Sequence, residues 1–164
     1  MKKQILALLC VLTINGIAIA DDTQIQLEAM DAERESVFKN KGSSNTYFSE
    51  NCPKHFTFWE QAAQQGQPIA QLFLASCYGT GNGVEKDEVQ AVTWYRKAAE
   101  QGNALAQTHL GFAYNDGKGT TKDQIQAVVW FRKAAEQGFA LAQAALGNVY
   151  DQGRGITYAS NPTI

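Results

Sequence analysis

The sequence predicts an all-α fold of about six stacked helices. The first reason is a stretch that returns at a fixed offset of 36 residues, at 58–66, 94–102 and 130–138. A constant period of this length is typical of stacked helical repeats. The second reason is that apolar residues within each unit recur at spacings of three and four, as they do on one face of a helix. The third is that glycine pairs separate these apolar stripes, as between antiparallel helices.

Each unit holds two apolar stripes, and we name the helices that carry them helix A and helix B. In the first full copy, helix A carries Ala70, Leu74 and Tyr78, and helix B carries Trp94 and Ala98. Neither helix can bury its stripe alone, so neighbouring units must stack on one another. The large aromatic residues of the stripes are expected to form the structural core: Tyr78, Trp94, Tyr114, Trp130 and Tyr150.

A Gly-x-Gly turn joins helix A to helix B, at 81–83 and again at 117–119. Glycine frees the backbone for a tight reversal. A Lys-Asp pair follows each turn, and Asp87 and Asp123 are expected to cap helix B. Because no strand pattern precedes these glycines, they indicate a turn and not a phosphate-binding loop.

The repeated motif resembles the Sel-1-like repeat, a relative of the tetratricopeptide repeat. It reads Ala-Gln-x-x-Leu-Gly-x-x-Tyr-x-x-Gly-x-Gly, then Lys-Asp-x-x-x-Ala-x-x-Trp-[Tyr/Phe]-Arg-Lys-Ala-Ala-Glu-Gln-Gly, and 106–138 matches it throughout. The first copy departs only at Leu74-Ala75. The resemblance covers about 58–155 and implies a helical solenoid, a right-handed α-α superhelix, whose usual role is to bind other proteins. It implies no reaction.

The chain divides into a leader, an N-terminal segment, a repeat array and a tail. The expected boundaries are a signal peptide at 1–20, a capping helix (about 23–39) with a linker at 21–50, an array at 51–155 and a tail at 156–164. The array itself is expected to comprise a partial unit at 51–66, full units at 67–102 and 103–138, and a truncated unit at 139–155. A B-type helix is expected at 53–65, with Pro53 at its start.

The first 20 residues have the composition of a secretory signal. Lys2-Lys3 precede an apolar run that ends at Ala18-Ile19-Ala20. The run is too short for a comfortable membrane span, so no stable membrane anchor is expected after cleavage. The short basic start is typical of bacterial signals and predicts a periplasmic or secreted protein. With a formal net charge of −2, the chain lacks the basic face that nucleic acid requires.

Two cysteines, Cys52 and Cys77, remain after signal removal. An even number in an oxidising compartment indicates a disulfide. Across a hairpin of the helices at 53–65 and 69–79, the two residues lie about one helical turn out of register. The alternative is a buried free Cys77, because Ala113 and Val149 occupy its place in the later copies.

The hypothesis that the chain is an enzyme has less support than the binding hypothesis. Some cysteine-rich relatives are described as penicillin-binding or β-lactam-hydrolysing, and Ser36-Val37-Phe38-Lys39 fits Ser-x-x-Lys. However, the chain contains neither Ser-Asp-Asn nor Lys-Thr-Gly. His55 and His109 form no metal-ligand set with the cysteines, so no catalytic residue, metal or cofactor is assigned.

Partner binding should use helix-A positions that differ between copies. In related solenoids the A helices line the concave face. The expected binding residues are Phe73, Ser76, His109, Phe112, Asn115 and Asn148. Phe112 is the candidate anchor, with packing against a neighbouring helix as the alternative. The expected function is a protein–protein interaction scaffold or adaptor with a protein partner, and the alternatives are a β-lactam or cell-wall hydrolase and a secreted host-directed factor.

Overall fold

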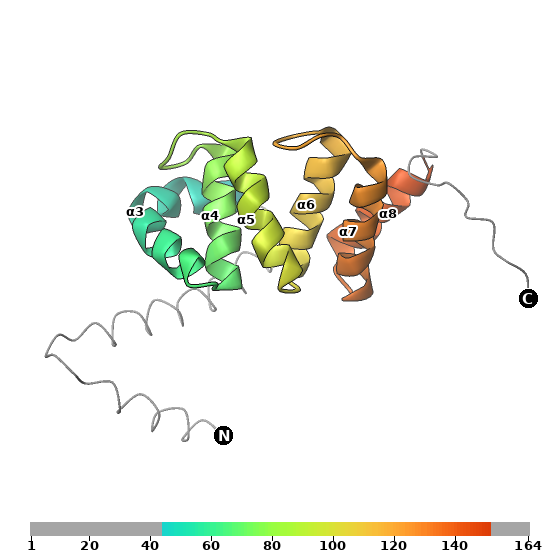
Figure 1. Ribbon diagram of the computed structural model, residues 1–164, viewed down its shortest axis with the longest axis horizontal. Helices are drawn as coiled ribbons and strands as arrows, with labels where there is room; N and C mark the ends of the chain where they lie inside the picture. The colour runs from blue at the N-terminus through green and yellow to red at the C-terminus, as the bar shows by residue number, and fades with distance from the viewer. Residues whose placement is uncertain (1–43, 152–164) are drawn as a thin grey trace, which may run out of the picture. The chain divides into compact units, whose positions relative to one another are not determined.

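A computed structural model describes residues 44–151 of the chain (Figure 1). This part is all-helical. Its helices are α3 (Ser44–Gln64), α4 (Pro68–Thr80), α5 (Glu88–Glu100), α6 (Ala104–Asp116), α7 (Gln124–Glu136) and α8 (Ala140–Asp151). The predicted all-α solenoid is therefore confirmed over these residues. The predicted signal peptide, N-terminal capping helix and C-terminal tail lie outside them.

The helices alternate in the predicted order. Helices α4, α6 and α8 are the A helices, and α3, α5 and α7 are the B helices. Each helix packs against the next one along the chain, from α3 on α4 to α7 on α8. Figure 1 shows them side by side in this order. Each unit therefore draws its stability mainly from its immediate neighbours.

Helix α3 corrects the predicted start of the first B helix. It begins at Ser44 and runs through the predicted linker, so Pro53 lies inside the helix and does not open it. Proline removes one helical hydrogen bond and disfavours this position. Tertiary packing outweighs that preference, because Phe48 packs edge-on against Phe73 at 5.7 Å between ring centroids and Cys52 is fully buried.

The aspartates of the Lys-Asp pairs cap the B helices as predicted. The Asp87 carboxylate accepts hydrogen bonds from the backbone N–H groups of Val89 and Gln90, both at 2.9 Å. Asp123 does the same for α7 at 3.0 Å. These bonds satisfy donors that the first turn of a helix leaves unpaired.

The two glycines of each turn have different functions. Gly81 and Gly117 end α4 and α6 in the left-handed conformation, at φ 76° and 74°. The second glycine lies against the preceding B helix: a Cβ built on Gly83 would lie 2.6 Å from the backbone nitrogen of Pro53. Gly119 meets the start of α5 in the same way. The motif therefore needs its second glycine for packing between units as well as for the turn.

Buried glutamines join three helices at a time. Gln71 is 3% exposed, and its amide nitrogen donates to the Ala63 carbonyl at the end of α3 at 3.2 Å. Its amide oxygen accepts from Gln101, just beyond α5, at 2.8 Å. Gln107 makes the equivalent two contacts one repeat later. Because both polar ends are satisfied, these buried amides fix the register of successive units.

The predicted aromatic core is only partly enclosed. Tyr114 and Trp130 are buried, whereas Tyr78, Trp94 and Tyr150 are half-buried. The ammonium groups of the lysines three residues after each tryptophan cover the rings, at 3.8 Å and 4.2 Å from the ring centroids. Although a lysine covers both rings, Trp130 is buried and Trp94 is only half-buried, so the two tryptophans have different environments at the same repeat position.

The arginine of helix B contacts the tyrosine of the next helix A. Arg96 donates to the Tyr114 hydroxyl at 2.7 Å, and Arg132 donates to Tyr150 at 3.0 Å. A cation near the C-terminal end of a helix also suits the negative end of the helix dipole. The contacts show a second role in joining neighbouring units.

Candidate partner-binding pocket between α5 and α6

A cavity of about 210 Å³ lies between α5 and α6. Its lining residues fall on one face of each helix. On α5 they are Glu88, Ala91, Val92 and Tyr95, and on α6 they are His109, Phe112, Ala113 and Asp116, with Gly79 and Lys118 completing the lining. Spacings of three and four place each set along one side of its helix. We call this cavity the α5–α6 pocket.

The equivalent space between α3 and α4 is filled. Thirty-six residues earlier, Cys52 stands in the place of Glu88 and Cys77 in the place of Ala113. These cysteines form the expected disulfide, with 5.7 Å between their Cα atoms. The position of Tyr95 is taken there by the larger Trp59, which is 1% exposed. The pocket therefore opens where both the disulfide and the large tryptophan ring are absent.

The inner wall of the pocket is a stacked aromatic pair. The rings of Tyr95 and His109 lie 4.8 Å apart and 19° from parallel. The Tyr95 hydroxyl is held by a hydrogen bond with Ser76 Oγ at 3.1 Å. Burial raises the pKa of Tyr95 to about 12, and the bond with Ser76 offsets part of that rise. Tyr95 is therefore a fixed, uncharged surface at neutral pH.

His109 is also uncharged at neutral pH. Burial lowers its pKa to about 4. Within residues 44–151, neither ring nitrogen of His109 forms a hydrogen bond. A neutral imidazole carries one hydrogen-bond donor and one acceptor. Both are free for a ligand in the pocket.

Phe112 forms a second aromatic wall. It is half-buried and packs edge-on against Phe131 of α7, with 5.0 Å between the ring centroids. Gly111 makes this packing possible, because a Cβ there would lie 2.6 Å from the Phe131 ring. The glycine of the Leu-Gly pair thus admits an aromatic ring from the next helix, which the sequence alone did not reveal.

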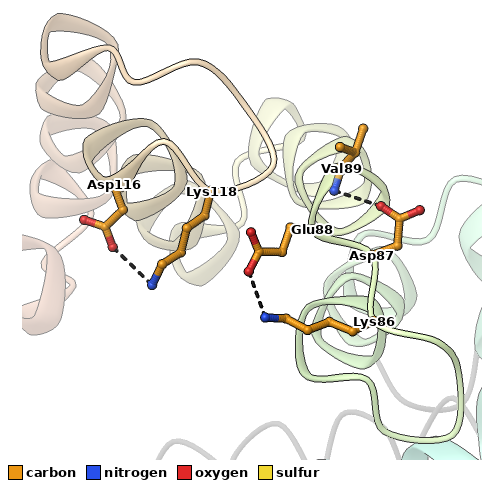
Figure 2. A network of polar contacts seen from close by, with 6 residues as sticks. All are labelled: Lys86, Asp87, Glu88, Val89, Asp116 and Lys118. Atoms are coloured by element: carbon orange, nitrogen blue, oxygen red, sulfur yellow. Dashed lines mark hydrogen bonds and ion pairs between the residues drawn. The ribbon is translucent and has the colours of Figure 1, made fainter.

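The rim of the pocket carries charge. Lys86 pairs with Glu88 at 2.8 Å, and Lys118 pairs with Asp116 at 3.5 Å. Figure 2 shows Lys118 extending towards Asp116 and Lys86 extending towards Glu88. All four side chains are well exposed, so these ion pairs are weak and can exchange for a ligand.

The structure corrects two of the predicted binding residues. Phe73 is 2% exposed and Ser76 is 6% exposed, so neither can contact a partner. Phe73 packs on Trp59 at 5.0 Å between centroids, and Ser76 bonds to the Leu72 carbonyl as well as to Tyr95. Their variation between copies reflects how the core is filled.

The other four predicted residues lie in three different places. His109 and Phe112 line the pocket. Asn115 is half-buried beside it and donates to Asp116 Oδ1 at 2.9 Å, while its own Oδ1 is buried without a partner in the described residues. Asn148 is exposed on α8. A single row of helix-A residues therefore does not form the site.

The sequence reasoning missed Glu88 and Tyr95, because it considered only the A helices. The signal was present in the helix-B positions that change between copies. Tyr95 is Trp59 in the copy before and Phe131 in the copy after. A search restricted to the concave A face omits one wall of the pocket.

Other kinds of site lack structural support in the part of the chain that the structure covers. No cluster of three metal-binding side chains occurs between 44 and 151. No helix in that range is long and apolar enough to cross a membrane. Ser36 and Lys39, the residues on which the hydrolase alternative rests, lie outside the described residues.

A family model described as Sel1 repeat matches residues 68–103, 104–139 and 140–163. Together these segments make up more than half of the chain. The matched units are displaced by one residue from the expected 67–102 and 103–138. A comparison with curated proteins gives no significant match.

Several solved structures are similar to this chain. A Sel1 repeat protein from Oxalobacter formigenes is 42% identical over 65% of this chain, with a TM-score of 0.62. The protein c5321, a protective antigen of uropathogenic Escherichia coli strains displaying an SLR fold, is 31% identical over 84% of this chain, with a TM-score of 0.65. The chain spans only 42% and 29% of these two proteins.

The third structure is Helicobacter pylori cysteine rich protein B. It is 24% identical over 65% of this chain, with a TM-score of 0.54, and its whole length is covered. This likeness concerns the fold alone.

Proposed function

Because this chain belongs to the Sel1 repeat family, whose members commonly act as protein interaction scaffolds, we propose that it is an exported scaffold that binds a protein partner at the α5–α6 pocket. The observation that carries the proposal is the open cavity of about 210 Å³, at a position filled in the preceding helix pair. Half-buried aromatic residues in such a cavity are typical anchors of protein interfaces.

Rigidity supports the same proposal. The buried amides of Gln71 and Gln107 fix the helices on both sides of the pocket. The disulfide fixes α3 against α4 one unit earlier. A site held in this way spends little conformational entropy when a partner docks. The pocket is therefore suited to recognising a protein segment with a protruding side chain.

Export is supported by the disulfide. Bonds such as Cys52–Cys77 form and persist in oxidising compartments and are rare in the cytosol. The test is fractionation of a bacterial host that produces the full chain, with thiol alkylation before and after reduction. We expect periplasmic or secreted protein without free thiols. Cytosolic protein with free thiols at Cys52 and Cys77 contradicts export.

The test of partner binding is cross-linking in periplasmic extract with matched variants. Phe112→Ala removes an aromatic wall, and Ala113→Leu, on the same helix α6, fills the cavity. Ile125→Ala is the control, because this side chain is 59% exposed on α7 and does not line the pocket. Circular dichroism melting establishes that all three variants fold.

We expect one or more cross-linked proteins with the wild type and with Ile125→Ala, and their loss with both pocket variants. Cross-links that survive in both folded pocket variants contradict binding at this site. If only Phe112→Ala weakens binding, we attribute the effect to loss of the contact between Phe112 and Phe131. That result also excludes the pocket as the binding site of the partner.

A further inference from the structure

The polar groups of the α5–α6 pocket are mainly hydrogen-bond acceptors. Glu88 lies on the α5 side and Asp116 on the α6 side, and each carboxylate offers acceptor atoms only. His109 adds one free imidazole acceptor at the inner wall. The cation in the lining is Lys118, which already pairs with Asp116. A ligand group that carries donors and positive charge therefore complements the lining.

The shape of the pocket selects among cationic groups. Its walls include the Tyr95–His109 stack and the Phe112 ring, so flat surfaces predominate. A guanidinium is planar, stacks on aromatic faces and is more weakly hydrated than an ammonium. The small apolar residues Ala91 and Val92 leave room for a methylene stem.

Resting on the proposed function, we propose that the α5–α6 pocket takes an arginine side chain presented by the partner protein. The guanidinium lies against the aromatic wall and donates to Glu88, Asp116 and the neutral His109. Arginine can serve several acceptors because it carries five donors in a fixed fork. Lys118 is 67% exposed and Lys86 is 56% exposed, so these lysines can release Asp116 and Glu88 to the incoming guanidinium.

Other anchors fit less well. A carboxylate could pair with Lys86 or Lys118 at the rim, but it would then displace Glu88 or Asp116 and bring no donor to the acceptors of the lining. A lysine offers a compact, strongly hydrated charge that stacks poorly on aromatic rings. A leucine or phenylalanine would fill the apolar part of the cavity and leave its acceptors to water. These residues are the competing outcomes of the experiment below.

The probes are five peptides of the form Gly-Ser-X-Ser-Gly, in which X is arginine, citrulline, lysine, leucine or phenylalanine. Citrulline has nearly the shape of arginine and no charge, so it isolates the charge of the guanidinium. Binding to the isotope-labelled chain is measured from amide NMR shifts. We expect shifts centred on His109 and Phe112, and about tenfold weaker binding for citrulline than for arginine.

The protein variants are Glu88→Gln and Asp116→Asn, with Glu100→Gln as control. Glu100 is exposed at the opposite end of α5 from the pocket. Each rim variant should weaken arginine binding about three- to tenfold, and the control should leave it unchanged. Equal binding of arginine and citrulline, tighter binding of leucine or phenylalanine, or the absence of arginine shifts at millimolar peptide each overturns the proposal.

The two proposals fail separately. If the partner cross-links are lost with Phe112→Ala and Ala113→Leu but persist with Glu88→Gln and Asp116→Asn, the pocket binds a protein through another side chain. The arginine proposal then fails and the proposed function stands. If the cross-links survive all four variants, the proposed function fails as well.

Discussion

Gly119 lies directly against the backbone of Glu88, so closely that a Cβ on the glycine would overlap the Glu88 carbonyl group. The same relationship joins Gly83 to Cys52 and Pro53, exactly one period of 36 residues earlier. The turns that follow α4 and α6 therefore rest on the B helix of the unit before, within α3 for Gly83 and at the start of α5 for Gly119. This contact fixes the position of each unit against the unit before it.

Replacing Gly119 should destabilise the array more than replacing another left-handed glycine. Gly102→Ala is the matched control: Gly102 has φ 90°, but nothing lies within 4 Å of a Cβ there. Strain alone should cost Gly102→Ala about 1–2 kcal/mol, and overlap should add about 1–3 kcal/mol for Gly119→Ala. Urea unfolding measures both. Equal losses would show that Gly119 serves the turn only.

Reduction of the disulfide should lower the stability of the chain. The bond closes a loop with a sequence separation of 25 residues, for which the chain-entropy estimate is about 3 kcal/mol. Urea midpoints with and without reductant measure the effect. The double variant Cys52→Ala/Cys77→Ala is the control, and reductant should leave its midpoint unchanged. An unshifted wild-type midpoint would contradict a stabilising role.

The two repeat tryptophans should differ in importance. Trp130 is 7% exposed, whereas Trp94 is half-buried under Lys97. Trp130→Ala should cost about 3–5 kcal/mol, the usual range for a buried aromatic residue, and Trp94→Ala clearly less. Thermal melting of the two variants measures the order. The reverse order would mean that stability depends on repeat position and not on burial.

His109 should make stability depend on pH. Its folded pKa is about 4, below the ordinary value of 6.5, so the unfolded chain binds the proton first as the pH falls. The free energy of unfolding should therefore decline between pH 7 and pH 4, by up to about 3 kcal/mol from this group. Urea titrations at several pH values measure the decline.

The control for that decline is His109→Phe, which copies the residue found at the equivalent Phe73. Acidic side chains titrate in both proteins, so the difference between the two curves isolates His109. Parallel curves for the wild type and the variant would show that His109 is not buried in its neutral form.

The fold was predictable because its signals are local and repeated. The spacing of Ala70, Leu74 and Tyr78 alone defines a helical face, and the later copies repeat it. The caps at Asp87 and Asp123 follow from the chemistry of one side chain and the next turn of backbone. The start of α3 was not predictable, because burial of Phe48 and Cys52 comes from α4 and outweighs the local preference of Pro53.

The candidate site was only half predictable. Variation between copies identified His109 and Phe112 but also selected Phe73 and Ser76, which the structure buries. A sequence shows that the residue at a position differs between copies. It does not show whether a partner or a neighbouring helix determines the size of the side chain there. The decisive fact is that Glu88 occupies the repeat position that the bonded Cys52 occupies one unit earlier. Its effect on the pocket depends on which residues face each other across two helices, and a sequence does not show this.

The disulfide gives the array a direction of unravelling. The bond between Cys52 and Cys77 fastens α3 to α4, whereas α8 exposes 47% of Leu141 at the other end of the described helices. In a one-dimensional stack, the weakest terminal element opens first and the loss travels inward. Hydrogen exchange should consequently spread from α8 towards the fastened end. Loss of α8 would still leave α5 and α6, and the α5–α6 pocket between them, packed together.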